Sequence, residues 1–187
     1  MDLTPASRSE LLGIARSGLR AAVEGRELIL PAPTHPELLQ PAGCFVSLHE
    51  RQSHRLRGCV GRLEASSPLW EIVRETAANV LDDPRFVQQR VTVDDLPLLD
   101  IELSVLSPLQ PAGSCEEFDL LNEGIYLTCG ERTGCFLPQV ARETGWTREQ
   151  LLERLCTEKL GLPGSAWRSG DVTLMRFTTL VIGPEPV

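Results

Sequence analysis

The sequence lacks any apolar run that approaches the length of a membrane span. Crossing a bilayer takes about 18 or more consecutive apolar residues, and polar or charged residues interrupt every hydrophobic stretch of this 187-residue chain well before that. The first residues, Met1-Asp2-Leu3-Thr4-Pro5, have neither the basic nor the apolar region of a secretory signal. We therefore expect a cytoplasmic protein without a membrane partner.

Lysine is nearly absent too. It occurs once, as Lys159, while all other basic residues are arginine, and 18 basic residues against 26 acidic ones give a net charge of −8. Binding to a nucleic-acid backbone depends on clustered cations, so this composition disfavours a nucleic-acid partner. The hydrophobic fraction of 42% is high enough to build a core and excludes a disordered chain.

No two cysteines have the C-x-x-C spacing, and in a cytoplasmic protein we expect the cysteines to be reduced. The evenly spaced residues Cys44, His49, His54 and Cys59 supply, on paper, the two cysteines and two histidines of a zinc site. Successive side chains of a strand alternate between its faces, so an odd spacing places Cys44 and His49 on opposite sides. We expect no metal site and no cofactor. The six cysteines are Cys44, Cys59, Cys115, Cys129, Cys135 and Cys156.

Helical and strand patterns intermingle without regular alternation, which predicts an α+β fold of antiparallel sheets flanked by helices. Ser7 and Ser67 are the expected N-caps of the first two helices, and Thr147 with Gln150 forms a capping box for the third, which Gly161 should end. The expected helices cover residues 8–24, 67–81 and 147–160; the hairpins cover 44–63 and 124–137; single strands cover 101–106 and 172–182; and 30–43 is a connector.

The hydrophobic pattern of the first hairpin predicts its register, pairing Phe45 with Cys59 and Ser47 with Arg57. One face of that hairpin would then be polar and cationic around the ring of Phe45. The residues expected on it are Phe45, Ser47, His49, Arg55, Arg57 and Cys59.

Cys59 is the candidate nucleophile on this face. Nearby positive charge lowers the pKa of a thiol, and Arg57 lies two residues away. Gly58 and Gly61 flank the thiol and would let a ligand approach main-chain N–H groups, which can cradle an anion. The alternative is that Cys59 is a small packing residue at a strand end.

Two further groups of polar residues have both a functional and a structural interpretation. Glu102 and Ser104 project from an otherwise apolar strand, as a general base with a hydrogen-bonding hydroxyl or as an exposed strand face. Asp83-Pro84-Arg85 is expected to be a helix-terminating turn with a local ion pair, the alternative being a ligand clamp.

The string Leu56-Arg57-Gly58-Cys59-Val60-Gly61 resembles the L-R-G-C-I-G signature of the AMMECR-type domain, also called AmmeMemoRadiSam system protein A in bacteria. Further blocks resemble that family in the same order, so that the similarity covers about residues 8–182. Val60 stands where the family usually has isoleucine. These blocks are Phe45 to Leu48, Asp83 to Phe86, Ile101 to Pro108, Phe136 to Val140 and Gly161 to Trp167.

The resemblance implies one AMMECR-type domain over residues 1–187, with two lobes and a cleft beside the cysteine motif. It supplies no reaction. It does imply an association with a Memo-type protein, related to extradiol dioxygenases, and with a radical S-adenosylmethionine protein. Metal and radical chemistry would then belong to those partners.

Two hypotheses about function follow. In the first, Cys59 is the nucleophile, Glu102 handles a proton and Arg57 orients a small anionic substrate. In the second, the protein is a non-catalytic binding or adaptor module for a small molecule, a peptide or a macromolecular partner, and Cys59 only packs. The predicted substrate-binding residues are Arg57, Gly58, Gly61, Ser47, Ser104 and Arg85.

Overall fold

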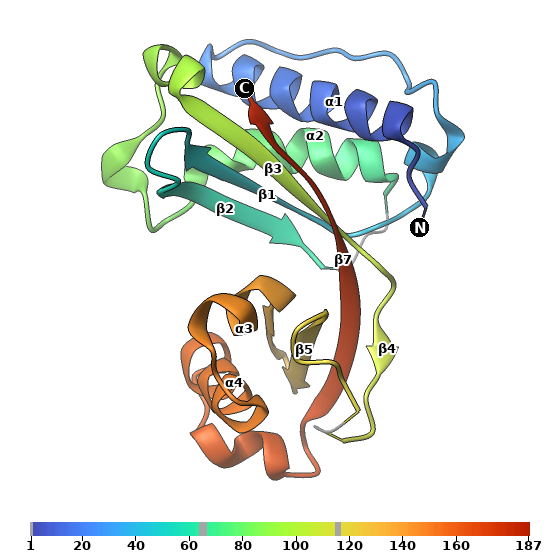
Figure 1. The fold of residues 1–187 in the computed structure, drawn as a ribbon, viewed down its shortest axis with the longest axis vertical. Coiled ribbons are helices and arrows are strands. Elements are labelled where there is room, and N and C mark those ends of the chain that lie inside the picture. The colour runs from blue at the N-terminus through green and yellow to red at the C-terminus, as the bar shows by residue number, and fades with distance from the viewer. Residues whose placement is uncertain (1, 64–66, 115–116) are drawn as a thin grey trace. The chain divides into compact units, whose positions relative to one another are not determined.

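The computed structural model describes residues 2–63, 67–114 and 117–187. The chain divides into two compact units, one made of the residues up to Leu106 with Leu180–Val187, the other of Ser107–Thr179 (Figure 1). Within the described residues, no helix is both long and apolar enough to cross a bilayer.

The first unit is an antiparallel sheet with two helices on one face (Figure 1). Its strand order is β2-β1-β3 followed by the last part of β7. The α elements are α1 (Pro5–Val23) and α2 (Leu69–Asn79), and the strands are β1 (Cys44–Glu50), β2 (Leu56–Arg62), β3 (Leu99–Leu106) and β7 (Thr173–Pro186). Short helical turns are η1 (Pro36–Leu39), η2 (Val80–Asp82), η3 (Val87–Gln89) and η4 (Val93–Leu98).

Alternation along β1 divides the residues of the sheet between two faces. Cys44, Val46 and Leu48 are fully buried and pack with the apolar side of both helices, whereas Phe45 and Ser47 are only partly buried and lie on the opposite face. The hydrophobic effect therefore fixes which residues the sheet presents away from its helices.

The second unit has its own core, between antiparallel strands and the helices that follow them. β5 pairs with both β6 and β7, and β4 pairs with β7. The elements are β4 (Gln110–Pro111), β5 (Glu123–Cys129), β6 (Arg132–Phe136), α3 (Pro138–Thr144), α4 (Arg148–Arg154), the π-helix η5 (Leu155–Leu160) and η6 (Gly164–Arg168).

Most of the predicted elements are present, and the α+β prediction is confirmed. The capping box of Thr147 and Gln150 is formed, and Gly161 ends the following helix with a φ of 63°. The N-caps were wrongly predicted: Thr4 caps α1 and accepts the Ser7 N–H, because the helix begins at Pro5. Among the described residues, no side chain caps α2, which Pro68 precedes. Helix α3 and the short turns were not predicted.

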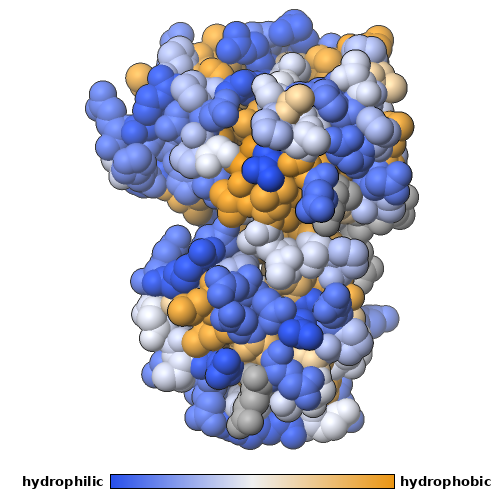
Figure 2. All heavy atoms as spheres, turned by 45° about the vertical axis from the view of Figure 1, so that its right-hand side comes forward, coloured by the Kyte–Doolittle hydropathy of each residue, from blue (hydrophilic) through white to orange (hydrophobic). Residues whose placement is uncertain are grey.

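Hydrophilic side chains cover most of the face shown in Figure 2, and apolar atoms gather between them on both units. The large hydrophobic side chains that are exposed among the described residues are scattered over loops, short turns and β7. They are Ile29, Leu39, Val87, Val93, Leu98, Leu121 and Val181.

Two glycines of α1 give a matched test of helix packing. A Cβ at Gly18 would lie 2.7 Å from the carbonyl oxygen of Arg74 in α2, whereas a Cβ at Gly13 would meet nothing within 4 Å. We expect Gly18→Ala to lower the free energy of unfolding by about 1–3 kcal/mol through overpacking. Gly13→Ala should raise it by about 0.5–1 kcal/mol, because alanine favours the helix. Urea denaturation of both variants measures the difference, and equal effects would contradict the close approach of the helices.

Candidate functional site

Three polar side chains form a row across the face of the sheet that turns away from its helices. Ser47 in β1 lies opposite Cys59 in β2 and opposite Glu102 in β3. Directly opposed residues of antiparallel strands project to the same side, so a thiol, a hydroxyl and a carboxylate follow one another over three strands. We call Cys59, Ser47 and Glu102 the thiol row.

The observed register corrects the expected one. Cys59 pairs with Ser47 and not with Phe45, which instead pairs with Gly61, so that the strands are shifted by two residues. Phe45, Ser47 and Cys59 still share one face, because the side-chain period of a strand is also two. Nearer the loop the predicted face is not kept, since His49 lies opposite Leu56 and not opposite Arg55 or Arg57. The shift is what brings the thiol beside the hydroxyl.

The backbone of Cys59 is held from outside the sheet. Its N–H donates to Asp83 Oδ2 at 2.9 Å, and its carbonyl oxygen accepts from Arg85 Nη2 at 3.1 Å. Both backbone groups therefore point away from β1, which makes Cys59 and Ser47 a non-hydrogen-bonded pair, the arrangement in which opposed side chains are closest.

Asp83 and Arg85 are themselves a paired unit. The guanidinium donates from Nε to Oδ1 at 3.0 Å and from Nη2 to Oδ2 at 2.7 Å, and the Asp83 side chain is only 2% exposed. The ion-pair prediction for this turn is confirmed. Burial alone would raise the pKa of Asp83, but the hydrogen bonds from Arg85 and from the Cys59 N–H outweigh burial and lower the pKa to about 2. We call this pair the Asp83–Arg85 clamp.

The surroundings of the Cys59 thiol disfavour its ionised form. Burial is the largest influence and raises its pKa, and the charges of Asp83 and Glu102 add to the rise. A hydrogen bond with Ser47 and the charge of Arg85 act in the opposite direction without reversing it. The charge of Arg85 thus acts as expected for an arginine but does not offset burial, and the activation of the Cys59 thiol stays a prediction.

Arg57 is directed elsewhere. It has no partner in β1, because a bulge falls between the pairs Leu48 with Gly58 and His49 with Leu56. Bulges re-aim side chains, and the Arg57 guanidinium donates to Glu50 Oε1 at 3.3 Å and to the carbonyl oxygen of Gln89 at 3.2 Å.

Both motif glycines have a packing reason for their size. A Cβ at Gly58 would lie 2.8 Å from the carbonyl oxygen of Val80, and a Cβ at Gly61 would lie 2.3 Å from the ring of Phe45. Gly58 thus lets η2, and with it the Asp83 turn, approach β2. Any contact of these glycines with a ligand stays a prediction.

Ser104 lies beside the thiol row, opposite Phe45, and is 4% exposed. The assignment of Ser104 to substrate binding stays a prediction. The assignment of Arg85 to substrate binding stays a prediction too, and its side chain is 57% exposed although it pairs with Asp83.

Within the described ranges, no group of three or more His, Cys, Asp or Glu side chains is arranged to hold a metal ion. Cys44 is fully buried against the helices, on the face opposite to Cys59. The five described cysteines are free thiols, and Cys115 lies outside the described residues.

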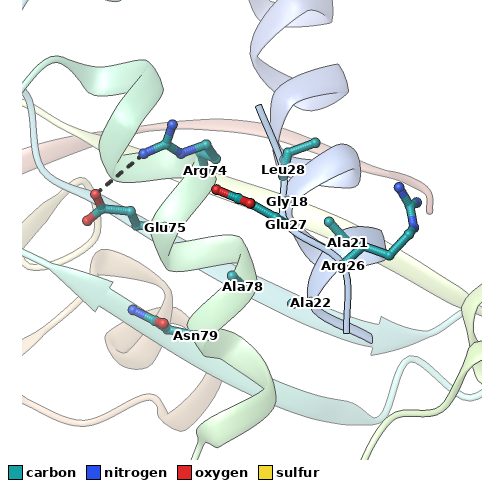
Figure 3. A pocket seen from close by; sticks show the side chains of 10 residues that line it. All are labelled: Gly18, Ala21, Ala22, Arg26, Glu27, Leu28, Arg74, Glu75, Ala78 and Asn79. Atoms are coloured by element: carbon teal, nitrogen blue, oxygen red, sulfur yellow. Dashed lines mark ion pairs between the residues drawn. The ribbon is translucent and has the colours of Figure 1, made fainter. Parts of the chain in front are cut away.

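A separate cavity of about 610 Å³ lies between α1 and α2, away from the thiol row (Figure 3). Small residues such as Gly18, Ala21 and Ala78 line it, and Arg74 at its edge pairs with Glu75 at 3.7 Å. It contains no cysteine, histidine or serine, so we place the candidate chemistry at the thiol row.

Comparison with known proteins identifies the family. The AMMECR1 family model matches residues 12–182. The chain belongs to the AMMECR1 family. Protein MJ0810 of Methanocaldococcus jannaschii is 32% identical over 87% of this chain and 83% of its own, and a protein of Thermococcus gammatolerans is 34% identical over 94% and 89%. The crystal structure of the uncharacterized protein PH0010 from Pyrococcus horikoshii superposes with a TM-score of 0.85 at 29% identity, over 95% of this chain and 96% of that one.

Asp83 is the site residue that the sequence analysis missed. Its neighbour Arg85 was predicted to bind substrate, and the turn was predicted to contain an ion pair, but nothing linked the carboxylate to Cys59, which lies 24 residues earlier. The available signals were the Asp83-Pro84-Arg85 turn, for which a ligand clamp was the alternative, and the resemblance of the block from Asp83 to Phe86 to the family.

The clamp predicts a specific acid sensitivity. Because the pKa of Asp83 in the folded state lies below the ordinary value near 3.9, its stabilising effect is fully present above about pH 4 and is lost as the pH falls through about 2. We expect Asp83→Asn to lower the free energy of unfolding at pH 7 by about 2 kcal/mol.

Denaturant unfolding between pH 2 and pH 7 measures this effect. The curves for the wild type and Asp83→Asn should converge toward pH 2. Asp82→Asn is the matched control, because Asp82 is the exposed neighbour. A constant gap between the wild type and Asp83→Asn at all pH values would contradict a charged clamp.

Proposed function

We propose that the thiol row is a small-molecule site at which Cys59 acts as a nucleophile that is deprotonated only when a substrate is bound. The supporting observation is the alignment of Cys59, Ser47 and Glu102 across three neighbouring strands. A nucleophile beside a hydrogen-bonding group and a base is the general pattern of covalent catalysis. The rigid hold of the clamp on the Cys59 backbone favours such a role, because a reacting atom must be positioned accurately.

The proposed step is an addition that needs no oxidant. The Cys59 sulfur forms a bond to an electrophilic carbon of the substrate while the π bond between that carbon and its neighbouring atom breaks. The electron pair of the π bond moves onto the neighbouring atom, which carries the negative charge that Glu102 gives up. The thiol proton passes to the Ser47 hydroxyl while the hydroxyl proton passes to Glu102, so the enzyme ends with a neutral carboxyl group. Glu102 is thus the general base, and Ser47 carries the proton between strands.

We also propose that this chemistry belongs to a pathway shared with a Memo-type protein and a radical S-adenosylmethionine protein. The support is the family membership together with the resemblance of the Leu56 to Gly61 motif to the bacterial system. Co-expression of the three proteins from one genome, followed by size-exclusion chromatography and by metabolite comparison of single deletions, tests the proposal. Deletions that accumulate unrelated compounds would contradict it.

The raised pKa of Cys59 favours a second candidate, a binding module in which the thiol only packs. A neutral thiol fits a packed position as well as a resting nucleophile. The two candidates differ in the consequence of Cys59→Ser, which would abolish a covalent reaction and leave binding nearly unchanged.

Alkylation of Cys59 by iodoacetamide provides the first test. We expect Glu102→Gln to lower the apparent pKa of the thiol and to speed its alkylation at pH 7 several-fold, because a negative charge is removed. Ser47→Ala should raise that pKa and slow alkylation several-fold, because the thiolate loses a hydrogen bond. Mass spectrometry of the folded protein from pH 6 to pH 10 gives both rates.

The other cysteines are internal controls in the same spectra. Burial strongly raises the pKa of the Cys44 thiol, so Cys44 should stay unmodified until the protein unfolds. If Cys59 reacts only after the protein unfolds, the proposal that Cys59 is a nucleophile is contradicted, and the binding module remains.

A further inference from the structure

The two arginines predicted to bind substrate differ in how completely their donors are used. Arg85 gives three short hydrogen bonds to the clamp carboxylate and the Cys59 carbonyl. Among the described residues, Arg57 donates two side-chain hydrogen bonds, at 3.2 and 3.3 Å, and its buried Nε has no hydrogen-bond partner there. A buried unsatisfied donor costs free energy, so the incomplete coordination of Arg57 calls for an explanation.

Arg57 lines a cavity of about 450 Å³, a size common for small-molecule sites. The cavity lies between the β1–β2 loop and η4, with Pro97 and Leu98 as its apolar wall. The Arg57 side chain is only 11% exposed, so water competes little for its guanidinium.

The other charged groups of the cavity already have partners. Glu50 accepts from Arg55, and Asp95 accepts from both the N–H and the hydroxyl of Thr92. Arg51 pairs with Asp100 at 2.9 Å. Among the described charged groups of this cavity, Arg57 is therefore the one whose donors are incompletely coordinated.

We propose that this cavity binds the carboxylate of a short aliphatic substrate whose electrophilic carbon reaches Cys59. The proposal rests on the proposed function of Cys59 and specifies its substrate class. The planar guanidinium matches a carboxylate with two parallel hydrogen bonds, which would use the Nε that now has no partner. The chain of the substrate would contact Pro97 and Leu98.

Glu50 occupies the anion position of Arg57 in the absence of such a substrate. Its contact with Arg57 is 3.3 Å, whereas its contact with Arg55 is 2.5 Å. An incoming carboxylate can therefore take over Arg57 while Glu50 stays paired with Arg55. After this exchange Glu50 is paired with Arg55, and the substrate carboxylate is paired with Arg57.

The spacing of the motif sets the length of the substrate. Cys59 does not line the cavity, so the substrate must extend beyond it, past the two residues that separate Arg57 from Cys59 on β2, a rise of about 6 to 7 Å in a regular strand. Roughly three to five bonds must then separate the carboxyl carbon from the reacting carbon, so that a two-carbon acid is too short.

A series of iodoacetyl amino acids tests this inference, because the reacting carbon stays the same while the carboxylate moves. Alkylation forms the bond from sulfur to carbon, releases iodide and passes the thiol proton to the buffer. We expect iodoacetyl-glycine or iodoacetyl-β-alanine to alkylate Cys59 on the order of tenfold faster than its own amide. Iodoacetate should show no such preference over iodoacetamide.

Three variants assign the preference to Arg57. Arg57→Gln should reduce the ratio of carboxylate to amide rates to about one, and Arg57→Lys, which keeps the charge without the planar fork, should leave only part of it. Arg62→Gln removes an equal charge from the same strand, where Arg62 pairs with Glu75, and should change nothing. Thermal unfolding confirms that each variant is folded.

A binding measurement separates this inference from the proposed function. Unreactive N-acetyl-β-alanine should shift the ¹⁵N resonance of Arg57 Nε in the wild type. If that shift occurs while the amide reagents fail to modify folded Cys59, the carboxylate site stands and the nucleophile fails. If the amides modify Cys59 but the rate ratio is one and no shift occurs, the carboxylate site is overturned and the nucleophile stands.

Discussion

The geometry of the site depends on the ion pair between Asp83 and Arg85. β2 is the edge strand beside β1, and an edge strand presents unpaired N–H and C=O groups. At Cys59 the side chains of the clamp form hydrogen bonds with both the backbone N–H and the backbone carbonyl oxygen. In the interior of a sheet a neighbouring strand would form these hydrogen bonds. The cost of burying the Asp83 charge is offset by a bidentate partner and by backbone donors.

The clamp also explains the glycine that precedes the cysteine. Asp83 follows η2, and η2 reaches β2 only because Gly58 has no side chain to meet the carbonyl oxygen of Val80. One small residue thus permits the approach of the turn, and the next residue receives its hydrogen bonds. Gly58 therefore matters first for packing, because it lets η2 contact β2. The position of Asp83 beside the Cys59 backbone follows from that contact.

The faces of the sheet could be predicted from the sequence, but its register could not. Hydrophobic alternation tells which residues of β1 and β2 point to the helices, and a slip of two residues leaves that alternation unchanged. Turn geometry and the bulge at Arg57 decide between the two registers, and both depend on tertiary contacts. The third member of the thiol row, Glu102, was proposed from its own strand alone, since no local pattern links it to Ser47.

The same limit applies to the two arginines. Arg57 and Arg85 have identical side chains, and the sequence placed both near the cysteine. The structure separates them by what their donors contact: Arg85 is fixed by a carboxylate two residues away, whereas Arg57 leaves the strand at a bulge and keeps a donor without a partner. The Arg85 guanidinium already donates to Asp83 and to the Cys59 carbonyl, so it holds the backbone in place. The Arg57 guanidinium has a donor without a partner and lies beside a cavity, so it retains the capacity to bind an anion. This difference is why we propose Arg57, and not Arg85, for recognition.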